Sequence, residues 1–291
     1  MSNASCSAEN PICGLRREGK RRALRTTGGK DGRETLLLLH GSAGSGALWR
    51  EQARTFAPDL RVLAPDLIGY GASPPWPEAR PFDLADEVRQ VRPLLPCCGR
   101  SVHVVGYSYG GAVALALAEA EPAMIKTLTL IEPVFFSALR RSGGVFAYSQ
   151  FQEVRARFSA TVAKGEHDDA MRGFIEFWTG PGSWDALEPA VRQGMISQVT
   201  KISLDWEASF AFDPAASLLH RLGRRTLLVR GDRSPIPMIH LVDALHALMH
   251  GSRLLVARGA NHMLPLTRGA WLTESLAEHM RVWAEPGAAH E

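Results

Sequence analysis

Short apolar runs bounded by turn residues alternate along the chain with segments of helical periodicity. The first run, 35–39, is continuously apolar and ends at His40-Gly41, which is typical of a parallel strand buried on both faces. We predict strands at residues 35–39, 61–64, 101–106, 125–131, 225–231 and 252–256. Helical patterns follow at residues 48–56, 82–95, 110–119, 236–249 and 269–284. This alternation predicts an α/β fold with a mostly parallel central sheet and helices on both faces.

The alternation stops between the fourth and fifth predicted strands. Residues 135–215 show helical periods and many aromatic side chains but no clear strand pattern. We therefore predict a helical cap or lid inserted over the carboxyl ends of the strands, with a core formed by residues 34–134 and 216–285. Residues 1–33 are rich in Gly, Arg, Ser and Thr without a period, so we expect a flexible tail there.

Composition and charge argue against several classes of protein. The 291 residues carry a net charge of only +3, too small to indicate nucleic-acid binding, and no apolar run approaches the roughly 18 residues that span a bilayer. The N-terminus lacks the apolar stretch of a signal peptide, and the four cysteines form neither a zinc pattern nor a disulfide framework. We expect a cytoplasmic monomer or homodimer that acts on a small molecule, without a membrane or nucleic-acid partner.

Ser108 is the leading candidate for a nucleophile. It lies in Gly106-Tyr107-Ser108-Tyr109-Gly110-Gly111, where an apolar strand passes directly into a helix, the context that a G-x-S-x-G elbow requires. The turn is so tight that larger side chains at 106, 110 or 111 would collide with the neighbouring strand and helix. The helix N-terminus beside the serine also favours developing negative charge.

Further motifs extend this pattern over most of the chain. They are His40-Gly41, Asp66-x-x-Gly69-x-Gly71-x-Ser73, the elbow at Ser108 and Asn261-His262. Together they resemble the α/β-hydrolase superfamily, specifically its capped single-domain serine hydrolases, over about residues 35–284. The resemblance implies that the backbone N–H groups of Ser42 and Tyr109 form an oxyanion hole. It implies no metal and no organic cofactor, and a dinucleotide-binding glycine fingerprint is absent from the sequence.

His262 is the expected general base. The sequence has ten histidines, but this one follows the last predicted strand and comes last in the chain order serine, acid, histidine that this fold uses. A histidine in that loop can lean back over the elbow and take the proton of Ser108.

The acid that should orient His262 has two candidates in the sequence, Glu132 and Asp232. The position that the superfamily most often uses holds Ser234, and Asp232 comes about two residues too early. Glu132 ends the fourth strand, beside the elbow, and its extra methylene helps it to reach across. We prefer Glu132, with Asp232 as the alternative; either residue could instead have only a structural role.

Aromatic residues of the predicted cap suggest the substrate. We expect Phe174, Trp178 and Trp184 to line an apolar pocket, since the first two share one helical face. The predicted function is hydrolysis of a small to medium, largely apolar ester or lactone through an acyl-enzyme. The same residues would serve a carbon–carbon bond hydrolase, a thioesterase or an acyltransferase. A different class, a ligand-binding protein of this fold without turnover, is kept as a rival because the acid position is unusual.

Overall fold

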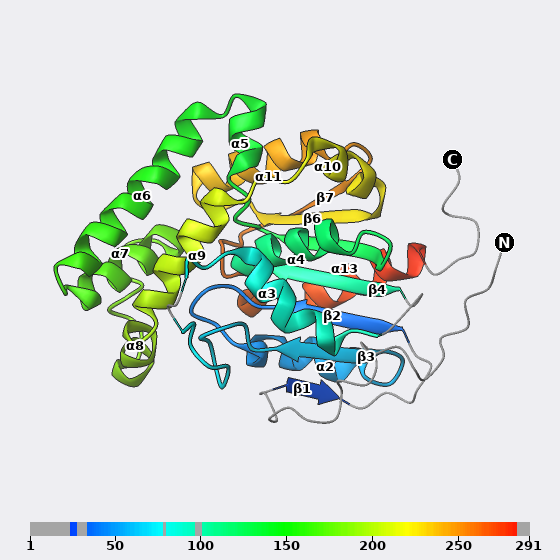
Figure 1. The fold of residues 1–291 in the computed structure, drawn as a ribbon, viewed down its shortest axis with the longest axis horizontal. Coiled ribbons are helices and arrows are strands. Elements are labelled where there is room, and N and C mark those ends of the chain that lie inside the picture. Colours follow the sequence, from blue (N-terminus) through cyan, green and yellow to red (C-terminus); the bar gives the residue numbers. More distant parts are fainter. Residues whose placement is uncertain (1–23, 28–33, 78–79, 97–100, 284–291) are drawn as a thin grey trace.

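A seven-stranded sheet forms the centre of the computed structural model, which describes residues 24–27, 34–77, 80–96 and 101–283 (Figure 1). The strand order is β1-β3-β2-β4-β5-β6-β7. The bounds are β1 (Leu24–Thr27), β2 (Thr35–Leu39), β3 (Arg61–Pro65), β4 (Val102–Tyr107), β5 (Ile125–Ile131), β6 (Thr226–Gly231) and β7 (Arg253–Ala257). Strands β2 to β7 are parallel, which confirms the predicted fold class.

Strand β1 was not predicted. It pairs antiparallel with β3 at the sheet edge, inside the segment 1–33 for which we expected only a flexible tail. Its sequence, LRTT, has no apolar run, and an edge strand needs only one neighbour to form its ladder. The expectation is therefore corrected for these four residues. The rest of that segment lies outside the described residues, as do all four cysteines.

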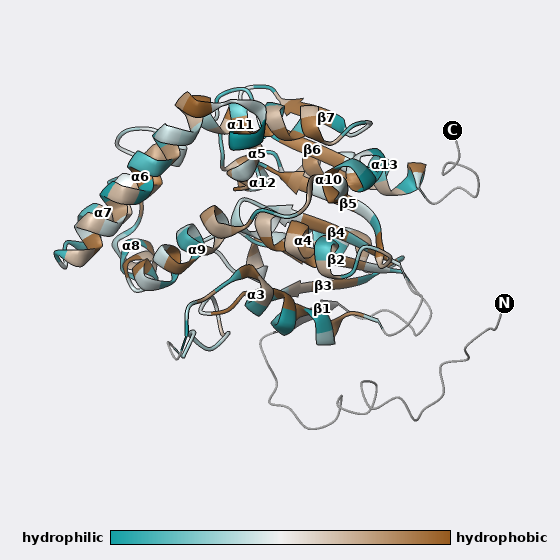
Figure 2. Cartoon of the chain, turned by 45° about the horizontal axis from the view of Figure 1, so that its top comes forward, coloured by the Kyte–Doolittle hydropathy of each residue, from teal (hydrophilic) through white to brown (hydrophobic). Residues whose placement is uncertain are grey.

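Helices cover both faces of the sheet because alternate strand residues point to opposite faces. Leu36 and Leu38 of β2 pack with α2 and α13, whereas Leu37 and Leu39 pack with α3, α4 and α11. The bounds are η1 (Gly46–Trp49), α2 (Arg50–Phe56), α3 (Leu84–Val91), η2 (Arg92–Leu94), α4 (Tyr109–Ala120), α10 (Ala216–Leu222), η3 (Gly223–Arg225), α11 (Ile236–Leu248), α12 (Leu264–Thr267) and α13 (Gly269–Val282). Figure 2 shows the apolar strands enclosed between these helices.

The chain between β5 and β6 contains helices and no described strand. We call α5 to α9 the inserted helices: α5 (Ser137–Ser142), α6 (Val145–Ala163), α7 (His167–Thr179), α8 (Pro189–Ile196) and α9 (Val199–Ala211). Helices α6 to α9 gather beyond the end of the sheet at which β5 leads into α5 (Figure 1). Their aromatic side chains stack on Phe136, whose ring centroid lies 4.1 Å from that of Phe210 and 5.5 Å from that of Trp206.

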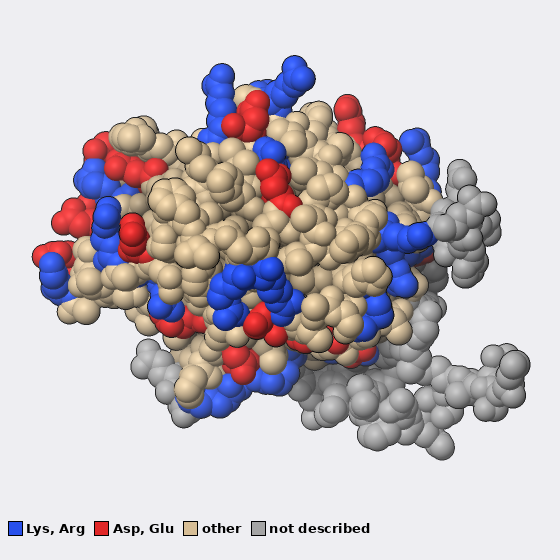
Figure 3. Space-filling model, turned by 90° about the horizontal axis from the view of Figure 1, so that it is seen from above, with Lys and Arg blue, Asp and Glu red and all other residues tan. Residues whose placement is uncertain are grey.

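The surface carries charges of both signs. Figure 3 shows Lys and Arg side chains interspersed with Asp and Glu over the face that it presents, without a large field of one sign. No helix within the described ranges has the length and apolar character needed to cross a membrane.

Candidate active site

Ser108 occupies a strained turn between β4 and α4. Its φ of 53° and ψ of −117° are unusual for a residue with a side chain and are found where surrounding packing enforces them. The neighbouring glycines permit the turn. A Cβ at Gly106 would lie 2.3 Å from the Gly110 carbonyl oxygen, and one at Gly110 would lie 2.5 Å from that of Leu39. The predicted elbow is thus present in the structure.

His262 reaches Ser108 from the loop between β7 and α12. Its Nε2 lies 3.1 Å from Ser108 Oγ, and both side chains are buried. The Trp178 ring stacks on the imidazole at a centroid distance of 4.1 Å, and the Tyr107 hydroxyl donates to the His262 carbonyl oxygen at 3.0 Å. Burial raises the pKa of Tyr107, which keeps this hydroxyl protonated as a donor. The imidazole is therefore held in place by contacts from both the core and the inserted helices.

Glu132 is the carboxylate that touches His262. It directly follows β5 with a φ of 44°, it is fully buried, and its Oε2 lies 2.6 Å from His262 Nδ1. Its Oε1 accepts from the Gly231 N–H at 2.7 Å and from the Ser234 hydroxyl. Ser234, which stands where the superfamily most often has its acid, thus donates to the carboxylate that lies against the histidine.

Asp232 has a different contact. Its Oδ1 accepts from the Gly259 N–H at 2.6 Å, at the turn after β7 that leads to His262. Because the two ring nitrogens of His262 already face Ser108 and Glu132, Asp232 supports the loop rather than the imidazole. The geometry brings Glu132, and not Asp232, to the histidine.

The two residues expected to form an oxyanion hole lie beside the nucleophile. Tyr109 is the first residue of α4, and the N–H groups of a first helical turn have no partner within the helix. Ser42 follows Gly41, at which an added Cβ would lie only 3.0 Å from the Cβ of Ser108. The backbone of this turn therefore packs directly against the elbow.

The side chain of Ser42 belongs to a buried polar network that the sequence analysis missed. Ser42 Oγ and the Tyr70 hydroxyl each donate to Asp205 Oδ2 at 2.5 Å, and Lys201 pairs with Asp205 Oδ1. Burial raises the pKa of Asp205, and the nearby Lys201 ammonium partly opposes that shift. Asp205 and Lys201 belong to α9, so one of the inserted helices is tied to the turn after β2.

Lys201 extends this network to Tyr109. Its Nζ lies 3.1 Å from Glu87 Oε1 and 3.4 Å from the Tyr109 hydroxyl, which itself donates to Glu87 Oε1 at 3.2 Å. Lys201 thus forms ion pairs with two buried carboxylates, Glu87 and Asp205. The only sequence signal was the i, i+4 spacing of Lys201 and Asp205, which is more often seen in exposed helical pairs. No three His, Cys, Asp or Glu side chains in the described part of the chain gather as a metal site.

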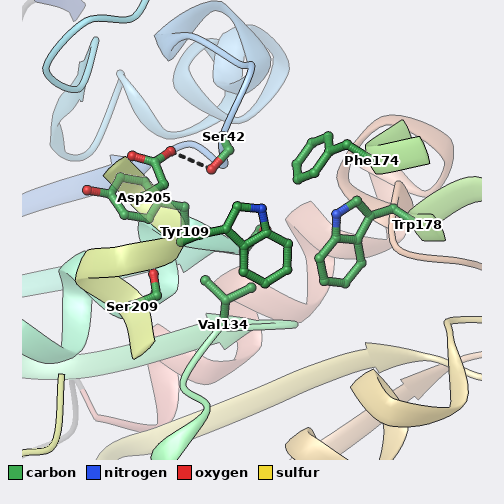
Figure 4. Close-up of a pocket in the computed structure, with 9 residues that line it drawn as sticks. Ser42, Tyr109, Val134, Phe174, Trp178, Asp205 and Ser209 are labelled. Atoms are coloured by element: carbon green, nitrogen blue, oxygen red, sulfur yellow. Dashed lines mark hydrogen bonds between the residues drawn. The ribbon is translucent and has the colours of Figure 1, made fainter. Parts of the chain in front are cut away.

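A narrow cavity, partly open to solvent, lies over Ser108 between the core and the inserted helices. Figure 4 shows Phe174 and Trp178 on one side of it and Asp205 and Ser209 on the other. Its lining residues are Ser42, Ser108, Tyr109, Val134, Phe174, Trp178, Asp205, Trp206 and Ser209. Phe174 and Trp178 thus line this cavity, and their contact with substrate stays a prediction.

Trp184 does not line this cavity, contrary to our expectation. It is fully buried among the inserted helices, and its indole nitrogen donates to Asp168 Oδ2 at 3.4 Å. From sequence alone, an aromatic residue in the predicted cap can either pack the cap or face the substrate. Trp184 packs the cap.

Comparisons with known proteins agree with this fold. The family model for the alpha/beta hydrolase fold matches residues 34–268, so the chain belongs to that family. A curated relative, lipase LipV of Mycobacterium tuberculosis, is 29% identical over 251 residues, which cover 81% of this chain and 89% of LipV. The protein is therefore an enzyme, a hydrolase of the α/β fold.

Solved structures show the same fold. A hydrolase from Pseudomonas aeruginosa PA01 superposes with a TM-score of 0.69 at 23% identity, covering 88% of this chain and 93% of that one. The α/β hydrolase MGS-M2 from a Medee basin deep-sea metagenome gives a TM-score of 0.74 at 15% identity, with the same coverage. At these identities the likeness concerns the fold alone.

Proposed function

We propose that this hydrolase cleaves a small, largely apolar carboxylic ester through a covalent acyl-enzyme on Ser108. The observation that carries the proposal is the continuous contact from Glu132 Oε2 to His262 Nδ1, 2.6 Å, and from His262 Nε2 to Ser108 Oγ, 3.1 Å. A nucleophile, a base and an orienting carboxylate within hydrogen-bond reach are the arrangement that activates a serine.

The geometry supports a two-stage reaction. Ser108 Oγ attacks the ester carbonyl while His262 Nε2 takes its proton, and Glu132 accepts the Nδ1–H of the resulting imidazolium. The tetrahedral oxyanion faces the backbone N–H groups of Ser42 and Tyr109. His262 then protonates the departing alcohol, which leaves the acyl group on Ser108. A water attacks that acyl-enzyme, giving its proton to His262, and Ser108 recovers its proton as the carboxylic acid departs.

Two observations favour a small ester as substrate. The cavity over Ser108 is narrow, with room for only about one or two water molecules in this structure, which disfavours a bulky substrate. Val134, Phe174 and Trp178 give it an apolar side that suits a short acyl chain. The relative LipV is named a lipase, which agrees with ester chemistry.

Labelling of the purified protein with a fluorophosphonate tests the proposal, with p-nitrophenyl acetate and butanoate assayed alongside. We expect labelling and ester turnover, both lost in Ser108→Ala, with kcat about 10⁶-fold lower. Labelling without turnover of any ester would move the proposal to carbon–carbon bond or thioester cleavage. A folded protein that binds ligands but leaves Ser108 unlabelled would refute the catalytic proposal and favour the ligand-binding rival.

A further inference from the structure

The cavity over Ser108 has a polar side that hydrolysis of a plain alkyl ester does not require. Helix α9 contributes three lining residues, Asp205, Trp206 and Ser209, two of which lie four positions apart on one helical face. In Figure 4, Asp205 and Ser209 stand across the cavity from Phe174 and Trp178. The cavity thus has an apolar wall from α7 and a wall with hydrogen-bonding groups from α9.

Two polar atoms of this α9 wall have no hydrogen-bond partner among the described residues: Trp206 Nε1 and Ser209 Oγ. Trp206 is only 5% exposed and Ser209 only 1%. Buried polar groups are paired in the great majority of cases, so two unpaired ones in residues that line the cavity call for a partner, which a bound substrate could supply. An indole N–H can only donate, and a serine hydroxyl can donate or accept.

Aromatic contacts hold the indole ring of Trp206. The Trp206 ring stacks with Phe136, at a centroid distance of 5.5 Å and 12° from parallel, and with Trp178, at 6.4 Å and 16°. Ser209 is one turn further along the same helix, which Asp205 anchors to Ser42 and Lys201. A donor that is held in this way recognises an acceptor without first having to become ordered.

The contacts of α9 place it on the Ser42 side of the cavity. The alcohol must depart beside His262 Nε2, which protonates it, and the ring contacts of His262 are with Tyr107 and with Trp178 of α7. Helix α9 instead touches the Ser42 side of the cavity, where the oxyanion is expected. A substituent on the acyl chain is therefore the part that comes to Trp206 and Ser209.

We propose that the substrate is the ester of a short carboxylic acid bearing a hydroxyl or oxo group, whose oxygen accepts from Trp206 Nε1–H and pairs with the Ser209 hydroxyl. This assignment rests on the proposed ester hydrolysis and adds the chemistry of the acyl group. A plain alkyl chain would bury both groups unpaired, and sites built to bind a polar group discriminate strongly against analogues that lack it.

The test compares ethyl butanoate with its 2-hydroxy, 3-hydroxy and 3-oxo derivatives as substrates. We expect kcat/KM to be about tenfold to a hundredfold higher for at least one oxygenated ester. Because oxygen substituents also change the intrinsic reactivity of an ester, the deciding quantity is the loss of this preference in Trp206→Phe and Ser209→Ala. Each variant should lower the ratio of kcat/KM for the preferred ester to kcat/KM for ethyl butanoate about three- to tenfold.

Matched controls come from the inserted helices. Ser203→Ala removes a hydroxyl of α9 that donates to the Val199 carbonyl oxygen, and Trp184→Phe removes an indole N–H away from the cavity. Neither should change the ratio of the two substrates. The inference is overturned if wild type shows no preference, or if the cavity variants slow all esters equally.

A second measurement separates this inference from the proposed function. The same esters are used to protect Ser108 from fluorophosphonate labelling, which requires binding but no turnover. If no ester is hydrolysed, the proposed function fails, yet stronger protection by an oxygenated ester in wild type and not in Ser209→Ala would still support the α9 wall. Equal protection by all four esters would refute the inference whether or not turnover occurs.

Discussion

Two buried carboxylates, Glu132 and Asp205, lie on either side of the site around Ser108, and they differ in the groups that bind them. Glu132 accepts from a backbone N–H, a serine hydroxyl and the imidazole of His262. Asp205 accepts from Ser42 and Tyr70, and the ammonium group of Lys201 pairs with it directly. Glu132 belongs to the end of a sheet strand, whereas Asp205 comes from an inserted helix.

Glu132 can therefore stabilise the positive charge that His262 gains during the reaction, whereas Asp205 stabilises the fold. The donors to Glu132 other than His262 are neutral, so its charge remains available when the imidazole becomes positive. The charge of Asp205 is already compensated by Lys201 in a buried pair, where breaking the pair costs more than the pair contributes. We therefore expect substitutions at Glu132 to act on kcat and substitutions around Asp205 to act first on stability.

The largest effect is expected for Glu132→Gln. The amide keeps the shape of the side chain but removes the charge that orients and stabilises the imidazolium, which should lower kcat by about 10⁴-fold with KM changed little. Thermal unfolding of the variant checks that the fold is intact. A kcat within tenfold of wild type would show that Glu132 is not the acid of this site.

Among substitutions in the network around Asp205, Lys201→Met should give the largest loss of stability. It leaves Glu87 and Asp205 buried without their cation, at a cost of about 3–5 kcal/mol in the free energy of unfolding measured with urea. Arg155→Met is the matched control, because its partner Glu207 is 60% exposed and such surface pairs contribute at most about 1 kcal/mol. Equal losses in the two variants would remove the distinction between buried and exposed pairs here.

The stability of the network around Asp205 should also depend on pH. The titrating group is His40, whose ring contacts Tyr70. Its Nδ1 donates to the Gly41 carbonyl oxygen and its Nε2 accepts from the Leu67 N–H, so the ring is neutral, and burial lowers its pKa to about 4. An unfolded chain protonates this histidine near pH 6.5. Between pH 6.5 and 4 the unfolded state then binds more protons, and stability falls as pH falls, by up to about 3 kcal/mol.

Urea unfolding at pH 7.5 and pH 5 measures this dependence. His40→Gln lacks the titrating group, so it should lose less stability than wild type between the two values. Identical losses in the two proteins would assign the acid sensitivity to other groups, among them His279, whose pKa burial also lowers to about 4.

The sequence predicted the parallel sheet and the Ser108 elbow because both depend on local patterns. Apolar runs mark buried strands, and the glycines around Ser108 are demanded by backbone atoms that lie within 3 Å of where a Cβ would stand. Glu132 could be named as a candidate because β4 and β5 were expected to be neighbours. Its choice over Asp232 required coordinates, since a few ångströms decide which carboxylate reaches His262.

The α9 network could not be predicted in the same way. Lys201, Asp205, Ser42 and Glu87 are contributed by segments separated by up to 163 residues, and only Ser42 stands beside a recognisable motif. Nor could sequence distinguish Trp178, which stacks on His262, from Trp184, which packs among the inserted helices. In each case the outcome depends on how the inserted helices dock, and that is tertiary packing without a local signal.

Asp232→Asn, which tests a third carboxylate near His262, should have the smallest effect. Asp232 is exposed and accepts from the Gly259 N–H, a bond that the side-chain oxygen of asparagine can also accept. Because the contact supports the loop before His262 without reaching the ring, kcat should stay within about threefold of wild type and the midpoint of thermal unfolding should change little. A fall in kcat comparable to that of Glu132→Gln would mean that His262 turns toward Asp232 during the reaction. The choice of acid would then reverse, and the contact with Glu132 would be a resting arrangement.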